Sequence, residues 1–211
     1  MKIKRFPYDD FAIDDPAAAL TASLQALFHR RDVKLHSASM SVRHAGAVHY
    51  LDGSSAANVV LGLTRPERWS SQPNEIARLE SPTAVHGAIY TVFDDIHAVI
   101  VGRPPATMAL LELGLSLGRP TSMMQKRNVA APDSHVVRAT RIDTTNAERL
   151  VREARSRADA AEMGHLLVIV PGWGLLCAAP NLAEAVAHFD TVEVTARAET
   201  ARLASQGGRN G

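Results

Sequence analysis

The side chains of this sequence that are best suited to hold a metal ion are nine histidines and one cysteine, Cys177. A single thiol excludes an intrachain disulfide and a multi-cysteine zinc site. The histidines are scattered, and none has the His-x-His or His-Glu-x-x-His spacing that directs two imidazoles to one metal ion. Cys177 follows two leucines, which predicts a buried, unreactive thiol. Metal chemistry therefore depends on where the histidines lie in the fold.

Motifs for other common chemistries are absent. The sequence contains no Gly-x-Gly-x-x-Gly, no phosphate-binding Gly-x-x-x-x-Gly-Lys-Ser/Thr and no Gly-x-Ser-x-Gly nucleophile motif. A net charge of +1 argues against bulk electrostatic binding of nucleic acid or anionic lipid. No apolar run reaches the roughly 20 residues that span a bilayer. The absence of a secretory signal and the single cysteine together predict a cytoplasmic protein.

Helices and strands mix along the chain, which predicts one α/β domain with a mixed sheet. Asp15 and Pro16 form an N-cap and first-turn pair, and Ser81 and Pro82 repeat that pair. Apolar periodicity predicts helices over 16–31, 81–93, 145–161 and 181–204, and another after 105. Strands are expected over 40–43, 47–51, 97–101, 136–141, 165–170 and 174–177, and a loop over 54–79.

Four segments carry motifs in a fixed order. They are Ala-Ser-Met-Ser-Val-Arg at 38–43, a helix and apolar strand at 86–101, Pro-Pro-Ala-Thr at 104–107, and an apolar strand, Gly-Trp-Gly and helix at 168–185. Together they resemble the class II aldolase/adducin family over about residues 16–200. The resemblance implies a single three-layer α/β domain at 16–204 with a central mixed or antiparallel sheet. Residues 1–15 then form an N-terminal extension and 205–211 a flexible tail, and a homo-oligomer, as a tetramer, is expected.

The resemblance also implies a divalent metal, usually zinc, held by three histidines, and here those positions are Val101, Arg103 and Trp173. None of these side chains is a metal ligand. The family's catalytic glutamate is replaced by Pro82, and Glu80 lies two residues away. We therefore expect no metal and no cofactor. A different metal site, built from Glu80, His86 and a loop histidine, is the open alternative.

The replacements have two interpretations each. Arg103 either binds a carboxylate, phosphate or developing oxyanion, or forms a structural salt bridge to Asp94, Glu112 or a neighbouring subunit. Trp173 either lines a ligand site as a stacking wall or fills the space that a metal and substrate occupy in the family.

Two serines are further candidates for ligand binding. Ser39 stands at the family's asparagine position, and Ser81 opens a helix whose free N–H groups suit an anion. Glu80 and His86 are the candidates for an acid or base, together with Arg103 as an electrophile.

Three functions remain open at this point. The first is a diverged family member without metal-dependent aldol cleavage, which keeps a small anionic-ligand pocket or acts as a scaffolding or partner subunit. The alternative is an active lyase, aldolase or epimerase with metal-independent chemistry on a sugar phosphate or small hydroxy or keto acid. The third is a hetero-oligomer in which a paralogous subunit supplies the histidines. None of the three involves nucleic acid or a membrane.

Overall fold

The fold is described from a computed structural model of the chain. It describes residues 15–33, 37–53, 55, 58–59, 65–69, 83–113, 140–141, 149–153, 156, 165–170 and 174–207. Across these ranges, no helix combines the length and the apolar character needed to cross a bilayer.

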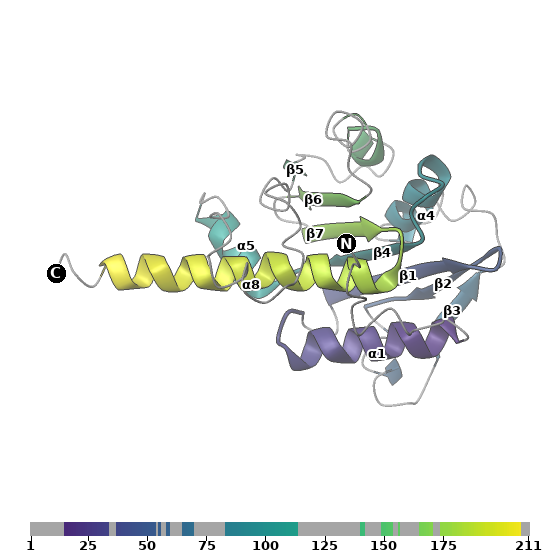
Figure 1. Cartoon of the computed structure of the whole chain (residues 1–211), viewed down its shortest axis with the longest axis horizontal. Helices are drawn as coiled ribbons and strands as arrows, with labels where there is room; N and C mark the ends of the chain where they lie inside the picture. Colours follow the sequence, from purple (N-terminus) through teal and green to yellow (C-terminus); the bar gives the residue numbers. More distant parts are fainter. Residues whose placement is uncertain are drawn as a thin grey trace, which may run out of the picture.

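A seven-stranded sheet forms the centre of the described structure, in the order β3-β2-β1-β4-β7-β6-β5 (Figure 1). Neighbouring strands pair antiparallel, except that β5 and β6 are parallel, so the expected mixed sheet is confirmed. The strands are β1 (Ala38–His44), β2 (Ala47–Leu51), β3 (Glu67–Trp69), β4 (Ala98–Gly102), β5 (Thr140–Arg141), β6 (Leu166–Val170) and β7 (Gly174–Ala179).

Helices cover both faces of the sheet and complete three layers. The helices are α1 (Pro16–His29), α4 (Thr83–Val92), α5 (Pro105–Glu112) and α8 (Leu182–Gly207). Side chains of α1 and α8 pack with one set of strand residues, which includes Ile100 and Cys177. Side chains of α4 pack with the alternate set, which includes Val99 and Val101. Because successive strand residues point to opposite faces, each strand contributes to two hydrophobic cores. The three-layer α/β architecture is thus confirmed.

Most predicted elements form, with differences at their ends. Asp15 caps α1 as expected, since its Oδ1 accepts hydrogen bonds from the amides of Ala17 and Ala18 at 3.0 and 3.1 Å. The prediction of a loop over 54–79 is wrong where β3 adds an edge strand to β2. The last helix continues three residues past 204 and ends at Gly207. The C-terminal half of α8 extends beyond the sheet (Figure 1).

The N-terminus of α5 is capped from a distant part of the chain. Its N-cap residue is Pro104, which makes no side-chain cap hydrogen bond. The buried carboxylate of Glu193, on α8, accepts hydrogen bonds from the amides of Ala106 and Thr107 and from Oγ1 of Thr107, each at 3.0 Å. This carboxylate occupies the end of α5 where unpaired N–H groups favour a negative charge. It also fixes the turn that leads from β4 into α5.

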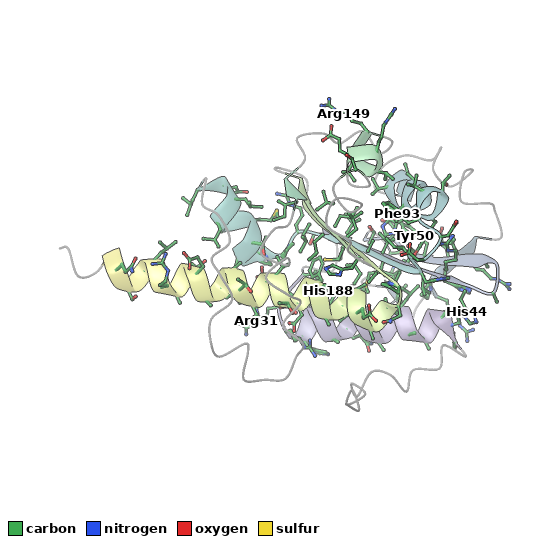
Figure 2. All side chains as sticks on the ribbon, turned by 45° about the horizontal axis from the view of Figure 1, so that its top comes forward. Arg31, His44, Tyr50, Phe93, Arg149 and His188 are labelled. Carbon is green, nitrogen blue, oxygen red and sulfur yellow. The ribbon has the colours of Figure 1, made fainter. Side chains whose placement is uncertain are left out.

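Arg197, one turn further along α8, extends this cap to the segment after α1. Its Nη2 lies 3.2 Å from Oε1 of Glu193 and 3.0 Å from Oδ1 of Asp32. The guanidinium also donates to the carbonyls of Arg30 and Arg31, at 3.0 and 2.6 Å. Arg31 has a positive φ of 62°, and Figure 2 shows it beside α8. One arginine therefore holds α8, the end of α1 and the start of α5 together.

Asp32 carries a strongly perturbed carboxyl group. Its side chain is fully buried, and its Oδ1 lies 3.0 Å from Nη2 of Arg197. Burial, reinforced by Asp190 and Glu193, raises the pKa of Asp32 to about 7, although Arg197 opposes this shift. Because the folded pKa lies above the unfolded value of 3.8, the protonated group favours folding below about pH 4. That stabilisation is lost as the pH rises through about 7.

We predict that Asp32→Asn changes stability in a pH-dependent way. Asparagine resembles the protonated carboxyl group, and wild type loses stability progressively between about pH 4 and pH 7, so the advantage of the variant should be smaller at pH 5 than at pH 8. At pH 8 it should be more stable, by about 1–2 kcal/mol, because it removes a buried charge. Urea unfolding at both pH values measures the difference. Asp95→Asn, at an exposed aspartate, is the matched control and should change neither value. An Asp32→Asn effect that is equal at the two pH values would contradict the raised pKa.

Candidate functional site

Three strand ends meet at one end of the sheet. In the antiparallel registers Ser39 of β1 lies opposite Val101 of β4, and Gly102 of β4 lies opposite Leu175 of β7. The first residues of β1 and β7 therefore flank the last residues of β4. Arg103 follows directly and is exposed, whereas Val101 is buried. Arg103 thus lies at the end of the sheet where β1 and β7 begin and β4 ends.

Gly174 allows β7 to begin close to β4. A Cβ atom at Gly174 would lie 2.5 Å from the carbonyl oxygen of Gly102 and 3.6 Å from Cγ of Arg103. A contact of 2.5 Å is a clash with a backbone atom, so any larger residue would push the two strands apart. The Cγ of Arg103 therefore lies beside the first residue of β7.

A chain of buried polar side chains leads from Ser39 into the layer between the sheet and α4. Oγ of Ser39 lies 2.9 Å from Nε2 of His86, and Nδ1 of His86 lies 2.7 Å from Oγ of Ser41. Oγ of Ser41 lies 2.8 Å from the hydroxyl of Tyr90, which donates to the carbonyl of His97 at 3.4 Å. We call these four side chains (Ser39, His86, Ser41 and Tyr90) the polar chain. It connects the exposed end of the sheet with the opposite end of β4.

His86 at the centre of the polar chain is neutral at physiological pH. Its side chain is fully buried, and burial lowers its pKa to about 3. The edge contact with the ring of Tyr50, at 5.2 Å between centroids and 85° between planes, encloses it further. Figure 2 shows Tyr50 between the strands and α4. A neutral imidazole carries one N–H, so it donates to one of its two serines and accepts from the other.

Arg43 fixes the far end of the polar chain. Its guanidinium donates to the backbone carbonyls of four residues that end α4 and precede β4, at 2.6–3.1 Å: Tyr90, Phe93, Asp94 and Ile96. Its Cζ also lies 5.0 Å from the centroid of the Tyr90 ring. Carbonyls at a helix C-terminus lack intrahelical partners, so this arginine satisfies them and holds Tyr90 in place.

The candidate residues from the sequence fall into two groups. Ser39, His86 and Arg103 come to the same end of the sheet, with Ser39 and His86 in hydrogen-bond contact. Glu80, Ser81 and Trp173 lie outside the described residues, so their roles stay predictions. Asp94, one proposed salt-bridge partner of Arg103, precedes β4, whereas Arg103 follows it, so the length of β4 separates them.

Two members of the polar chain were not among the candidates, and the sequence holds a signal for both. Ser41 lies two residues from Ser39 and so shares its face of the strand. Tyr90 lies four residues from His86 and so shares its face of the helix. Glu193 gave no such signal, because 86 residues separate it from Thr107.

The metal implied by the resemblance does not fit the described residues at this end of the sheet. Val101 offers only carbon atoms, and the guanidinium of Arg103 is a cation that carries no lone pair for a metal. Within the described ranges, no three His, Cys, Asp or Glu side chains gather in a way that could hold a metal ion. The donor set instead suits an anion, which a guanidinium and a hydroxyl can bind by hydrogen bonds.

A sheet of this order, covered on both faces by helices and with its candidate site at the end of the central strands, defines the class II aldolase fold. The family model described as the Class II Aldolase and Adducin N-terminal domain matches residues 19–200. This match covers most of the chain, which therefore belongs to the class II aldolase and adducin family.

Solved structures agree on the fold. L-fuculose-1-phosphate aldolase from Thermus thermophilus aligns with a TM-score of 0.59 and 18% identity, over 90% of this chain and 95% of that chain. YgbL from Escherichia coli, a putative aldolase/epimerase/decarboxylase, aligns at 0.59 and 16%, over 86% of each chain. A sugar-phosphate aldolase from Thermotoga maritima aligns at 0.56 and 11%, over 91% and 96%. A search of curated proteins found no match.

We predict that the imidazole of His86 stabilises the fold through the polar chain. His86→Ala leaves the hydroxyls of Ser39 and Ser41 without this partner and opens a cavity, so the free energy of unfolding should fall by about 3 kcal/mol. Urea denaturation at pH 7 measures the loss. His97→Ala removes an exposed histidine side chain and should cost less than about 0.5 kcal/mol. Similar small losses in both variants would show that the buried contacts contribute little.

Proposed function

We propose that this chain binds a small anionic ligand, of the sugar-phosphate or hydroxy-acid class, at the end of the sheet formed by β1, β4 and β7. The observation that carries the proposal is that Arg103, an exposed residue, follows β4 directly at the position where the family resemblance implies a metal-ligating histidine. A guanidinium binds carboxylates and phosphates through two parallel hydrogen bonds.

The proposal excludes metal-dependent aldol cleavage as the function of this site. Class II cleavage leaves a negatively charged enediolate, which a metal ion stabilises as a Lewis acid. Such a metal needs neutral nitrogen or anionic ligands, and Val101 and Arg103 supply neither. The positive charge of Arg103 also repels a divalent cation. What the site retains is the ability to neutralise an anion.

The fold neighbours support the ligand class. Two of them are named as aldolases of L-fuculose 1-phosphate and of sugar phosphates, so this fold accepts phosphorylated small molecules in other chains. In this chain Ser39 adds a hydroxyl at the same end of the sheet as Arg103. Hydroxyl and guanidinium groups together are common partners of phosphate oxygens.

The same observation favours a second candidate function, which is metal-independent chemistry on the bound anion. An arginine at the site can stabilise an oxyanion that develops during a reaction. Glu80 is then the candidate acid or base, since His86 is fully buried and both of its ring nitrogens are hydrogen-bonded. Turnover of a bound hydroxy acid or sugar phosphate by the chelator-treated protein would favour this function over binding alone.

We predict that Arg103→Ala weakens anion binding by roughly tenfold or more, because it removes charge-assisted hydrogen bonds. Isothermal titration with inorganic phosphate and with L-fuculose 1-phosphate, after chelator treatment, measures the affinity. Arg202→Ala is the matched control, since it removes the same charge from the exposed end of α8 and should leave the affinity unchanged. Equal affinity of Arg103→Ala and wild type, or binding that requires added zinc, would refute the proposal.

We also propose that the chain forms a homo-oligomer, with a tetramer expected. The support is two exposed apolar side chains on the packed helices α5 and α8: Leu113, just after α5, is 71% exposed and Val194 is 37% exposed. Sedimentation velocity at micromolar concentration should show the oligomer, and Leu113→Ser should weaken it. Asp95→Ser, at an exposed charged position that precedes β4, is the control. A monomer would contradict the proposal, and co-purification of a second chain would favour a partner-subunit role.

A further inference from the structure

The polar chain has two ways to arrange its hydrogen atoms. The tautomer of a neutral histidine is set by the hydrogen bonds that its two ring nitrogens make. Each hydroxyl in the polar chain can donate one hydrogen bond and accept others. When each hydroxyl donates its hydrogen to its neighbour in the polar chain, the direction of one hydrogen bond fixes the direction of the others.

In the first arrangement every hydrogen is donated within the protein. Nδ1–H of His86 donates to Ser41, the Ser41 hydroxyl donates to Tyr90, and Tyr90 donates to the carbonyl of His97. The hydroxyl of Ser39 then donates to the bare Nε2 of His86 at 2.9 Å. Ser39 consequently offers only lone pairs to the site, and lone pairs repel an anion.

In the second arrangement the hydrogen bonds between the side chains are reversed, and Tyr90 gives up its bond to the carbonyl of His97, which can only accept. Tyr90 donates to Ser41, Ser41 donates to Nδ1 of His86, and Nε2–H donates to Oγ of Ser39. The hydroxyl hydrogen of Ser39 is then left for the site. Among the described residues this hydroxyl contacts His86, and Ser39 is 3% exposed. A buried donor without an acceptor is costly, so this arrangement needs an acceptor from outside, such as an anion.

We propose that His86 is a positioning residue whose tautomer changes when an anion binds at the site. It carries its hydrogen on Nδ1 in the free protein and on Nε2 when an anion is bound, and thereby turns Ser39 from an acceptor into a donor. This inference rests on the proposed anion binding, and it adds the group that decides the polarity of the site. A ligand that interacts differently with two states must shift their populations.

Tyr90 provides a test at a distance from the ligand. In Tyr90→Phe the hydroxyl of Ser41 loses its acceptor in the first arrangement, whereas the second arrangement keeps an acceptor for the Ser41 hydrogen on His86. Without ligand, each arrangement of the variant leaves one buried hydroxyl without an acceptor, Ser41 in the first and Ser39 in the second, so both tautomers should be populated. A bound anion satisfies Ser39 and leaves no hydroxyl without an acceptor, so the affinity of the variant for an anion should rise by about fivefold. A residue with a merely structural role would weaken binding or leave it unchanged.

The experiment combines nitrogen NMR of histidine-labelled full-length protein with titration of inorganic phosphate. The His86 signal is identified by its loss in His86→Asn and by its failure to titrate near the usual histidine pKa. We expect Nδ1–H in the free wild type and Nε2–H at saturating phosphate. In Tyr90→Phe we expect both tautomers without ligand, Nε2–H at saturating phosphate, and tighter binding than in wild type. Ser39→Ala should stay Nδ1–H at all phosphate concentrations, and Ser39→Thr, which restores a hydroxyl, should recover the switch.

The outcomes separate this inference from the proposed function. Phosphate binding to wild type with an unchanged tautomer overturns the switch and leaves anion binding intact. Weaker phosphate binding by Tyr90→Phe, or an Nε2–H tautomer in the free wild type, also overturns the switch alone. Absence of binding by phosphate and sugar phosphates to wild type overturns both, since no anion would then reverse the polar chain.

Discussion

The carboxylate of Glu193 at the start of α5 is the interaction on which the arrangement of the site depends. A helix that begins with two prolines has no side chain of its own to cap its amides, and Glu193 on α8 supplies the missing acceptor. Arg197 neutralises that carboxylate and at the same time binds the segment after α1. The turn that carries Arg103 is therefore fixed by helices on the opposite face of the sheet from α4.

The two faces of the sheet consequently have different structural roles. The face covered by α1 and α8 combines an apolar core with a buried charge cluster at its edge, and this combination sets the path of the backbone. The face covered by α4 holds the polar chain, which is uncharged and reaches the end of the sheet. The charged side chains near this second face lie at the two ends of the polar chain. Arg43 binds backbone carbonyls at one end, and Arg103 is exposed at the other. An anion at Arg103 would thus meet a site whose neighbouring groups are dipoles, and dipoles can reorient at low cost.

Local chemistry made much of the fold predictable, and long-range pairing limited the rest. Asp15 before Pro16 marked the start of α1, and the apolar run that ends at Val101 marked a central strand, because both signals lie within a few neighbouring residues. The three-residue β3 was missed, since a short edge strand has too few residues for an alternating pattern. At the site, the loss of ligating side chains at Val101 and Arg103 could be read from residue types. The pairing of Glu193 with α5 and the burial of His86 could not, because both arise from tertiary packing.

Cys177 lies in the middle of β7, 1% exposed, and burial raises its pKa well above the ordinary thiol value. A thiol that is both covered and protonated does not react with oxidants or alkylating reagents until the strands around it separate. Since it is the sole sulfhydryl of the sequence, the folded chain cannot cross-link to another copy through sulfur. The rate at which a thiol reagent labels Cys177 therefore measures how often the strands around it separate.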